Sequence, residues 1–233
     1  MTVSGVTSDP MTANELYMAA FNALGVAQEG EPMTPRMYND AKRAANMLIK
    51  QWNAHPRLWI KAEGSVAMVA GQAAYALSPQ PLRVLSVRRR LNGIDTPLGE
   101  YSRQEYFDQP NKTQSPSVPV NFYFDPQVGA GTLYLWPSPS AQTVTQYSIN
   151  YTYVRRVSLL VNSNDTLDMP EEWQGAFTWN LAKWLMTQYP VNDPSLAQIV
   201  LGMAQSSYSD MMNWDNEPAS IYLQPDFEGL RGA

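Results

Sequence analysis

The sequence contains no cysteine and a single histidine, His55. Without cysteine the chain can form no disulfide framework, no thiolate zinc site and no cysteine nucleophile. One histidine also excludes a metal centre built from several histidines of one chain. A chain of 233 residues needs no such cross-links, because a domain of this size buries about 70–75% of its unfolded surface. We therefore expect neither a metal nor another cofactor.

Charged side chains are scarce, at 16% of the sequence, where soluble domains usually have about 25%. The formal net charge is −5, which disfavours a general nucleic-acid binder, because such proteins carry a strongly basic face. Aromatic residues make up 11% and there are 18 prolines. An uncharged, aromatic-rich surface is typical of a protein that assembles with others.

Signals for export or membrane insertion are missing from the sequence. Residues 1–35 hold no lysine or arginine, so the positively charged start of a secretory signal is lacking. No apolar run approaches the roughly 18 residues of a membrane span. We expect synthesis in a cytoplasm-like compartment and no contact with a membrane.

The charges that are present are unevenly distributed along the chain. Residues 1–35 carry −4, residues 36–112 carry +6, residues 113–156 carry +1 and residues 157–233 carry −8. Acidic ends therefore flank a basic centre. Such asymmetry indicates charged neighbours rather than a particular fold.

Helical periodicity is found at both ends of the chain. A capping box at Thr12 starts the first helix, and Thr34-Pro35 starts a longer one that ends before Pro56. A third helix opens at Asp168–Glu172, where carboxylates suit the helix dipole, and Asp193-Pro194 starts a fourth. These four helices carry apolar stripes that must be buried together.

The central region changes to short apolar runs bounded by glycine and proline, which predict strands. The predicted strands are Val66–Val69, Ala73–Leu77, Leu82–Leu91, Val120–Phe124, Thr132–Trp136 and Thr145–Val154. Asn92-Gly93 predicts a tight hairpin. In the last strand Ile149, Tyr151 and Tyr153 alternate with polar residues, so one face is covered.

These elements predict an α+β fold. Two N-terminal and two C-terminal helices, within residues 1–58 and 165–213, form a four-helix, ring-forming body. Residues 59–164 form an inserted, antiparallel β-rich domain. Residues 214–233 form an extended C-terminal arm, which is too short for a core of its own.

No residue pattern points clearly to catalysis. His55 lies at a helix end without a nucleophile-elbow serine, which favours a surface or capping role. Glu171 and Glu172 could be a glycosidase pair, but adjacent helix residues point apart. Asp165 and Asp168 lack the rest of a calcium loop. We expect no enzyme activity and no small-molecule substrate.

Arg88, Arg89 and Arg90 form the one basic cluster. On a regular strand Arg88 and Arg90 share a face with Val84, and Arg89 lies on the other. The cluster could contact a neighbouring subunit or the phosphates of DNA in a channel. The alternative, which we favour for the cluster alone, is a solvated strand edge whose charges prevent aggregation.

The C-terminal arm is apolar, with Ile221, Tyr222, Leu223, Pro225 and Phe227. One interpretation is a last strand docked on its own domain. The other is an arm donated to a partner. The sequence pattern favours the two about equally.

Six segments, in their order and spacing, resemble the head-to-tail adaptor (connector, or packaged-DNA stabilisation) proteins of short-tailed bacteriophages. The segments are Ala23–Ala27, Met47–Trp52, Tyr75–Pro79, Arg83–Val87, Leu133–Pro139 and Leu167–Trp173. The resemblance covers residues 12–227.

The resemblance implies a ring, usually of twelve copies, that docks under the portal protein and carries the tail nozzle or tailspikes. Such a ring lengthens the DNA channel, helps to retain the packaged genome and allows non-specific contact with DNA. The C-terminal arm would lie along the portal. The protein would be made in the bacterial cytoplasm and end in the virion, at the portal vertex. The alternatives are a phage-associated glycan or peptidoglycan hydrolase, with Glu171 or Asp168 as the acid, and another tail ring component such as a nozzle or plug.

Overall fold

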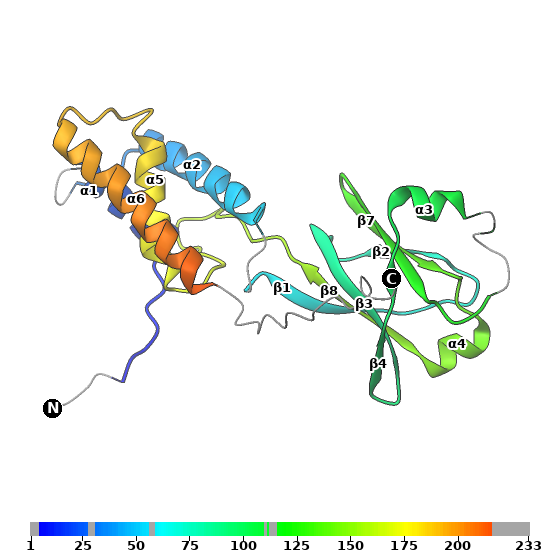
Figure 1. Ribbon diagram of the computed structural model, residues 1–233. Helices are drawn as coiled ribbons and strands as arrows, with labels where there is room; N and C mark the ends of the chain where they lie inside the picture. Colours follow the sequence, from blue (N-terminus) through cyan, green and yellow to red (C-terminus); the bar gives the residue numbers. More distant parts are fainter. Residues whose placement is uncertain (1–4, 28–30, 56–58, 110, 112–115, 216–233) are drawn as a thin grey trace, which may run out of the picture.

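The computed structural model describes residues 5–27, 31–55, 59–109, 111 and 116–215. The described residues form six helices and two four-stranded sheets, so the predicted α+β class is confirmed. The four long helices gather at one end of an elongated molecule and the sheets at the other (Figure 1). The ring-forming role of these helices and the domain boundaries stay predictions.

Helices α1 (Ala13–Ala23) and α2 (Pro35–Asn53) begin at the predicted caps. The backbone N–H of Glu15 donates to Thr12 Oγ1 at 3.4 Å, and the N–H of Thr12 donates to the Glu15 carboxylate at 2.7 Å. This reciprocal pair satisfies two amides that the helix itself leaves free. Thr34 caps α2 without a reciprocal bond, by accepting the N–H of Met37 at 3.3 Å.

Helices α5 (Trp173–Leu185) and α6 (Pro194–Trp214) follow the sheets in the chain. Asp193 caps α6 as predicted, since it accepts the N–H of Ser195 at 2.8 Å. The start of α5 differs from the prediction, because Glu172 makes no side-chain cap. Asp168 lies before the helix and binds Arg155 instead.

One hydrophobic core joins these four helices, and α5 packs on α1, α2 and α6. Its largest side chains are aromatic. The Trp52 ring lies edge-on to Trp173 and Phe177, with centroids 5.6 and 5.8 Å apart, and 5.1 Å from Tyr208 of α6. Helices from the two ends of the chain are therefore buried against each other.

The first sheet contains only antiparallel pairs, in the order β1-β8-β3-β4. Its strands are β1 (Lys61–Val66), β8 (Ser148–Val154), β3 (Arg83–Leu91) and β4 (Ile94–Pro97). The predicted hairpin joins β3 to β4, with positive φ of 51° and 83° at Asn92 and Gly93. Positive φ at both positions matches the right-handed twist of the strands.

The second sheet has the order β2-β7-β6-β5. Its strands are β2 (Ala74–Leu77), β7 (Ala130–Trp136), β6 (Asn121–Gln127) and the short β5 (Gly99–Glu100), which runs parallel to β6. Two short helices, α3 (Arg103–Asp108) and α4 (Ala141–Gln146), lie in the same region. The second hydrophobic core forms from both sheets. It includes Ile149, Tyr151 and Tyr153, so the predicted alternation along the last strand is confirmed.

The strands begin or end up to three residues from the predicted positions, and β1 differs by more. The strand expected at Val66–Val69 is β1, which ends at Val66. The residues of β1 have weak strand propensity. Position 64 requires a glycine, because the Tyr151 ring lies against it and a Cβ there would be 2.6 Å from that ring. The strand expected from Thr145 begins at Ser148, because Ser140 caps α4 by accepting the N–H of Thr143.

A bulge in β3 corrects the predicted face of the arginines. Val84 pairs with Tyr153 and Ser86 pairs with Thr152, so Leu85 is the extra residue. Leu85 packs on the helical core instead. An inserted residue shifts the alternation by one, so buried Val84 lies on the face of Arg89 and not on that of Arg88.

We predict that Phe177→Ala lowers the free energy of unfolding by about 3–5 kcal/mol, because it opens a cavity in the core shared by the four long helices. Phe177 is fully buried. Urea denaturation at neutral pH measures the change. The control is Val128→Ala in the exposed turn between β6 and β7, where a change within about 0.5 kcal/mol is expected. A loss below about 1 kcal/mol for Phe177→Ala would show that α5 is not central to stability.

Candidate functional site

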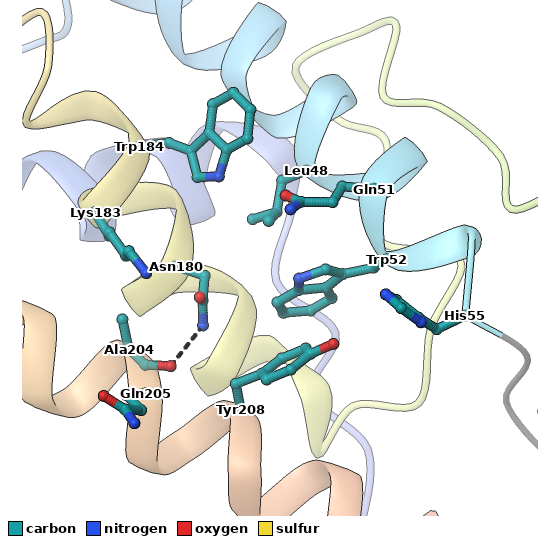
Figure 2. Close-up of a pocket in the computed structure, with 10 residues that line it drawn as sticks. All are labelled: Leu48, Gln51, Trp52, His55, Asn180, Lys183, Trp184, Ala204, Gln205 and Tyr208. Carbon is teal, nitrogen blue, oxygen red and sulfur yellow. Dashed lines mark hydrogen bonds between the residues drawn. The ribbon is translucent and has the colours of Figure 1, made fainter.

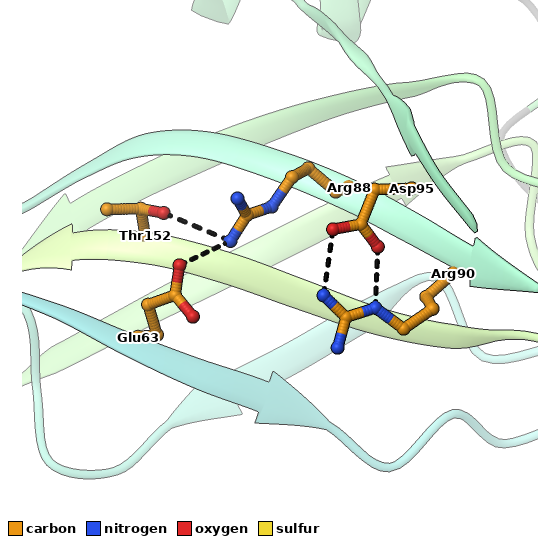
Figure 3. Close-up of polar contacts among 5 residues, drawn as sticks. All are labelled: Glu63, Arg88, Arg90, Asp95 and Thr152. Carbon is orange, nitrogen blue, oxygen red and sulfur yellow. Dashed lines mark hydrogen bonds and ion pairs between the residues drawn. The ribbon is translucent and has the colours of Figure 1, made fainter. Parts of the chain in front are cut away.

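Arg88 and Arg90 lie side by side on the outer face of the first sheet (Figure 3). Arg90 makes a bidentate ion pair with Asp95 of β4, with its Nε 2.6 Å from Oδ1 and its Nη2 2.8 Å from Oδ2. Arg88 Nη2 donates to Glu63 of β1 at 2.7 Å and to Thr152 of β8 at 3.4 Å. Each arginine is therefore held by a carboxylate from another strand.

These ion pairs neutralise the outer face. The hydrogen bonds from Arg90 lower the pKa of Asp95, and the same bonds raise the pKa of Arg90. Both groups are charged at neutral pH, and Arg88 and Arg90 are matched by Glu63 and Asp95. The cluster that is conspicuous in the sequence thus has little unbalanced charge in the structure.

Arg89 points to the opposite side of β3. Its Nη1 donates to the carbonyl oxygen of Pro119 at 3.0 Å. Pro119 lies just before β6 of the second sheet, so Arg89 links the two sheets. The structure therefore brings Arg88 and Arg90 together but separates Arg89 from them. The solvated-edge interpretation of the cluster is wrong, because β3 is paired on both sides, with β8 and β4.

The carboxylates considered for catalysis hold the ends of the helices in place. Asp168 accepts two hydrogen bonds from Arg155, at 2.5 and 2.9 Å, and one from the N–H of Ser158 at 2.9 Å. Burial opposes ionisation of Asp168, but these bonds outweigh it and lower its pKa. Glu171 accepts from the Ser8 hydroxyl and the N–H of Asp9, which lowers its pKa as well. A glycosidase acid needs a raised pKa, so neither group suits that role.

Asp165 also has a structural partner set. It accepts the backbone N–H groups of Val161 and Asn162, each at 2.7 Å, and these bonds lower its pKa. They close the turn that precedes α5. Within the residues that the structure describes, no group of three or more histidines and carboxylates is placed to hold a metal ion.

His55 lines a hollow of about 280 Å³ between α2, α5 and α6 (Figure 2). The other lining groups that carry polar atoms include Gln51, Asn180, Lys183 and Tyr208, and Asn180 donates to the carbonyl oxygen of Ala204 at 2.9 Å. No carboxylate is among the lining residues. The hollow therefore lacks the paired acid and base of a hydrolase.

A second basic surface, which the sequence reasoning missed, lies on α2. Arg36, Arg43 and Lys50 are seven residues apart and exposed, so they form one row along the helix; we call it the basic row. Arg36 lies 3.7 Å from Asp40. Arg43 and Lys50 make no ion pair with any other described residue. The seven-residue spacing was the signal that could have found this row.

Residues 11–221 match the family model described as SU10 adaptor protein. The chain belongs to this family of phage head-to-tail adaptors. The resemblance read from the sequence is thereby confirmed. The adaptor is a structural component of the virion that takes part in tail assembly. A family of this kind speaks against the hydrolase alternative.

No curated protein matches the adaptor. One chain of a solved structure, described as the neck of an empty GTA particle computed with C6 symmetry, is similar at 13% sequence identity. The similarity covers 79% of the adaptor and 83% of that chain, with a TM-score of 0.31.

The arm residues Ile221, Tyr222, Leu223, Pro225 and Phe227 lie outside the described residues. Their role at a partner stays a prediction. In the described ranges, no helix of the adaptor has the length and apolar character needed to cross a membrane.

The lowered pKa of Asp168 predicts a pH dependence of stability. Its folded pKa lies below its unfolded value, so the stabilisation is complete above the unfolded pKa of about 3.9 and is lost as the pH falls through the folded pKa. We expect Asp168→Asn to lower the free energy of unfolding by about 1–2 kcal/mol at pH 7. The difference from the unmodified chain should shrink below about pH 4 in urea denaturation.

Glu172→Gln is the matched control, because Glu172 is exposed and makes no hydrogen bond or ion pair with another described residue. It should change stability by less than about 0.5 kcal/mol at either pH. A loss for Asp168→Asn that stays constant from neutral to acid pH would show that the carboxylate charge does not stabilise the fold.

Proposed function

We propose that this adaptor forms a ring that docks on the portal protein, lengthens the DNA channel and helps to retain the packaged genome. The ring would also be the platform to which the tail nozzle or tailspikes attach. The observation that carries this proposal is the match to the adaptor family over residues 11–221.

The described surface supports an assembling protein. Large apolar side chains are exposed on the outer sides of the helices and on the segment before α5. They include Met47 at 55%, Val161 at 59%, Ile199 at 57% and Trp214 at 57% exposure. Large apolar groups grouped on one part of a surface mark contact sites. The sheet end exposes Val69, Ile94 and Phe107 as well. We place contacts with other copies at the helical end because Arg43 and Lys50 lie there without an ion-pair partner among the described residues.

The arm is the second part of the proposal. Residues 216–233 contain the large apolar side chains of Ile221, Tyr222, Leu223 and Phe227, each of which contributes about 1.5–3 kcal/mol when fully buried. Prolines and glycines prevent a long helix in this segment. We propose that the arm lies along the portal or a neighbouring copy.

Arg88 and Arg90 are the third part. They lie exposed or half-buried on the outer face of the sheet, where they can contact DNA in the channel or an acidic surface of a neighbour. Arg89 is a link between the sheets and is not part of this contact. Because Glu63 and Asp95 compete for the two arginines, the contact would be strengthened when these acids are removed.

The proposed ring and arm predict the behaviour of the adaptor with its portal. Mixed with the portal protein of the same phage, the full chain should add a symmetric ring in class averages of electron micrographs. A chain that ends at Asp215 should melt within about 2 °C of the full chain, because the arm has no core of its own, but it should not dock stably. A full chain that adds no ring would contradict the proposed function. A truncated chain that melts far earlier would place the arm in its own core.

The proposed contact of Arg88 and Arg90 predicts opposite effects for two matched variants. Arg88→Ser with Arg90→Ser should weaken ring docking or genome retention. Glu63→Ser with Asp95→Ser should leave them unchanged or strengthen them, because the freed arginines gain unbalanced charge. Both variants break the same two ion pairs, so a difference between them does not come from the loss of those pairs. Docking is measured at several salt concentrations. If both variants weaken docking equally, the four residues have only a structural role.

A further inference from the structure

The basic row of α2 borders a groove with an apolar floor. Two adjoining hollows of about 460 and 330 Å³ share Lys50 and Leu159 among their lining residues. The first is lined by α2 and Leu159, and the second continues past the end of α2 to Leu82 and Val157. Met47 and Leu159 are 55% and 39% exposed. The groove therefore offers apolar contact with positive charge along its rim.

Hydrogen bonds fix the second wall of this groove. Asn46 donates from its Nδ2 to the carbonyl oxygen of Leu160 and accepts the N–H of Leu160, each at 2.9 Å. Lys42 donates to the carbonyl oxygen of Val161 at 2.5 Å. A groove that is already formed loses little conformational freedom when a partner binds.

Helix α6 has a complementary surface. Ile199, Met203, Asp210 and Trp214 follow each other at spacings of four and seven residues, so they lie along one side of the helix; we call them the α6 row. All four are exposed, and the three apolar side chains are 57%, 41% and 57% accessible. Asp210 makes no hydrogen bond or ion pair with another described residue. From residue 184 to residue 230 the sequence has no lysine or arginine, so α6 itself contributes no basic side chain to this row.

The two rows also match in length. From Arg36 to Lys50 the basic row is about 21 Å long, and from Ile199 to Trp214 the α6 row is about 22 Å long. Both helices pack on α5, and they contact each other at Trp52 and Tyr208, on the sides that face the core. Each row is on the exposed side of its helix, away from the shared core. One copy therefore cannot bring its own two rows together.

We infer that the groove beside the basic row of one copy receives the α6 row of a second copy. Such a contact joins two different surfaces of the same chain, and repetition of it generates a closed ring when the rotation permits. The inference rests on the proposed ring and names the surfaces that build it. A nucleic-acid backbone is the less favoured occupant, because phosphates make no apolar contact with Met47 and Leu159, which line the groove.

Charge reversal on the two surfaces tests the inference. The first variant carries Arg43→Glu and Lys50→Glu, and the second carries Ser206→Lys and Asp210→Lys on α6. Each variant alone places like charges at every contact, so the concentration needed for ring assembly on the portal should rise at least about tenfold. An equimolar mixture of the two should assemble again, because every contact between unlike copies pairs opposite charges.

The matched control for the first variant is Arg83→Glu with Arg103→Glu, which makes the same change in net charge in the sheet region and also removes the ion pair of Arg103 with Asp125. It should assemble like the unmodified chain. Circular dichroism and thermal melting of each variant confirm that it is folded, and mass photometry with the portal counts the adaptor copies.

Several outcomes would overturn the inference while leaving the proposed function intact. The variants could assemble as the unmodified chain does, or the mixture of two folded variants could fail to assemble. The first variant could also assemble normally but lose salt-dependent binding of a short DNA duplex in fluorescence anisotropy, which would make DNA the occupant. An unmodified chain that forms no ring on the portal would instead overturn the proposed function, and this inference with it.

Discussion

The burial of α5 is the constraint on which the rest of the structure depends. This helix comes late in the chain, yet it packs on α1 and α2 from the beginning and on α6 after it. Its side chains Trp173, Phe177 and Leu181 are fully buried. Residues 54–172 separate α2 from α5, so the chain must leave the helical core and return to the same place. The pairing of β1 with β8 achieves this, because Lys61 lies opposite Val154 and the two crossings run side by side.

The return point is also where the two ends of the molecule are fixed to each other. Directly after β8, the N–H of Arg155 donates to the carbonyl oxygen of Ile60, and its guanidinium binds Asp168 before α5. The same guanidinium lies 6.0 Å from the centre of the Trp59 ring. Ile60 and Val157 are themselves part of the helical core. A force applied to the sheets would therefore pass to the helices through a hydrogen-bonded junction, as suits a protein between a head and a tail.

The sequence predicted elements whose signals are local and failed where a distant contact decides. The caps at Thr12, Thr34 and Asp193 act within three residues, and the structure has all of them. The bulge at Leu85 exists because the Leu85 side chain reaches the helical core. The alternation of residues along β3 cannot predict such a contact. The start of α5 moved for the same reason: the Asp168 carboxylate, expected at the helix dipole, is bound by Arg155. For the candidate site, the sequence located the arginine cluster but not the acids that neutralise it.

This last difference changes where charge can guide association. A cluster of arginines in the sequence shows only that the residues are neighbours along the chain. Attraction between molecules depends on the charge that remains unbalanced in the folded structure. On the sheet, antiparallel register places Asp95 directly opposite Arg90, so that pair contributes little at a distance. On α2, Arg43 and Lys50 have no such partner among the described residues. They are two helical turns apart, so they do not form a cluster in the sequence. Unbalanced positive charge is therefore available on α2, and this is the charge that the proposed contact between copies would use.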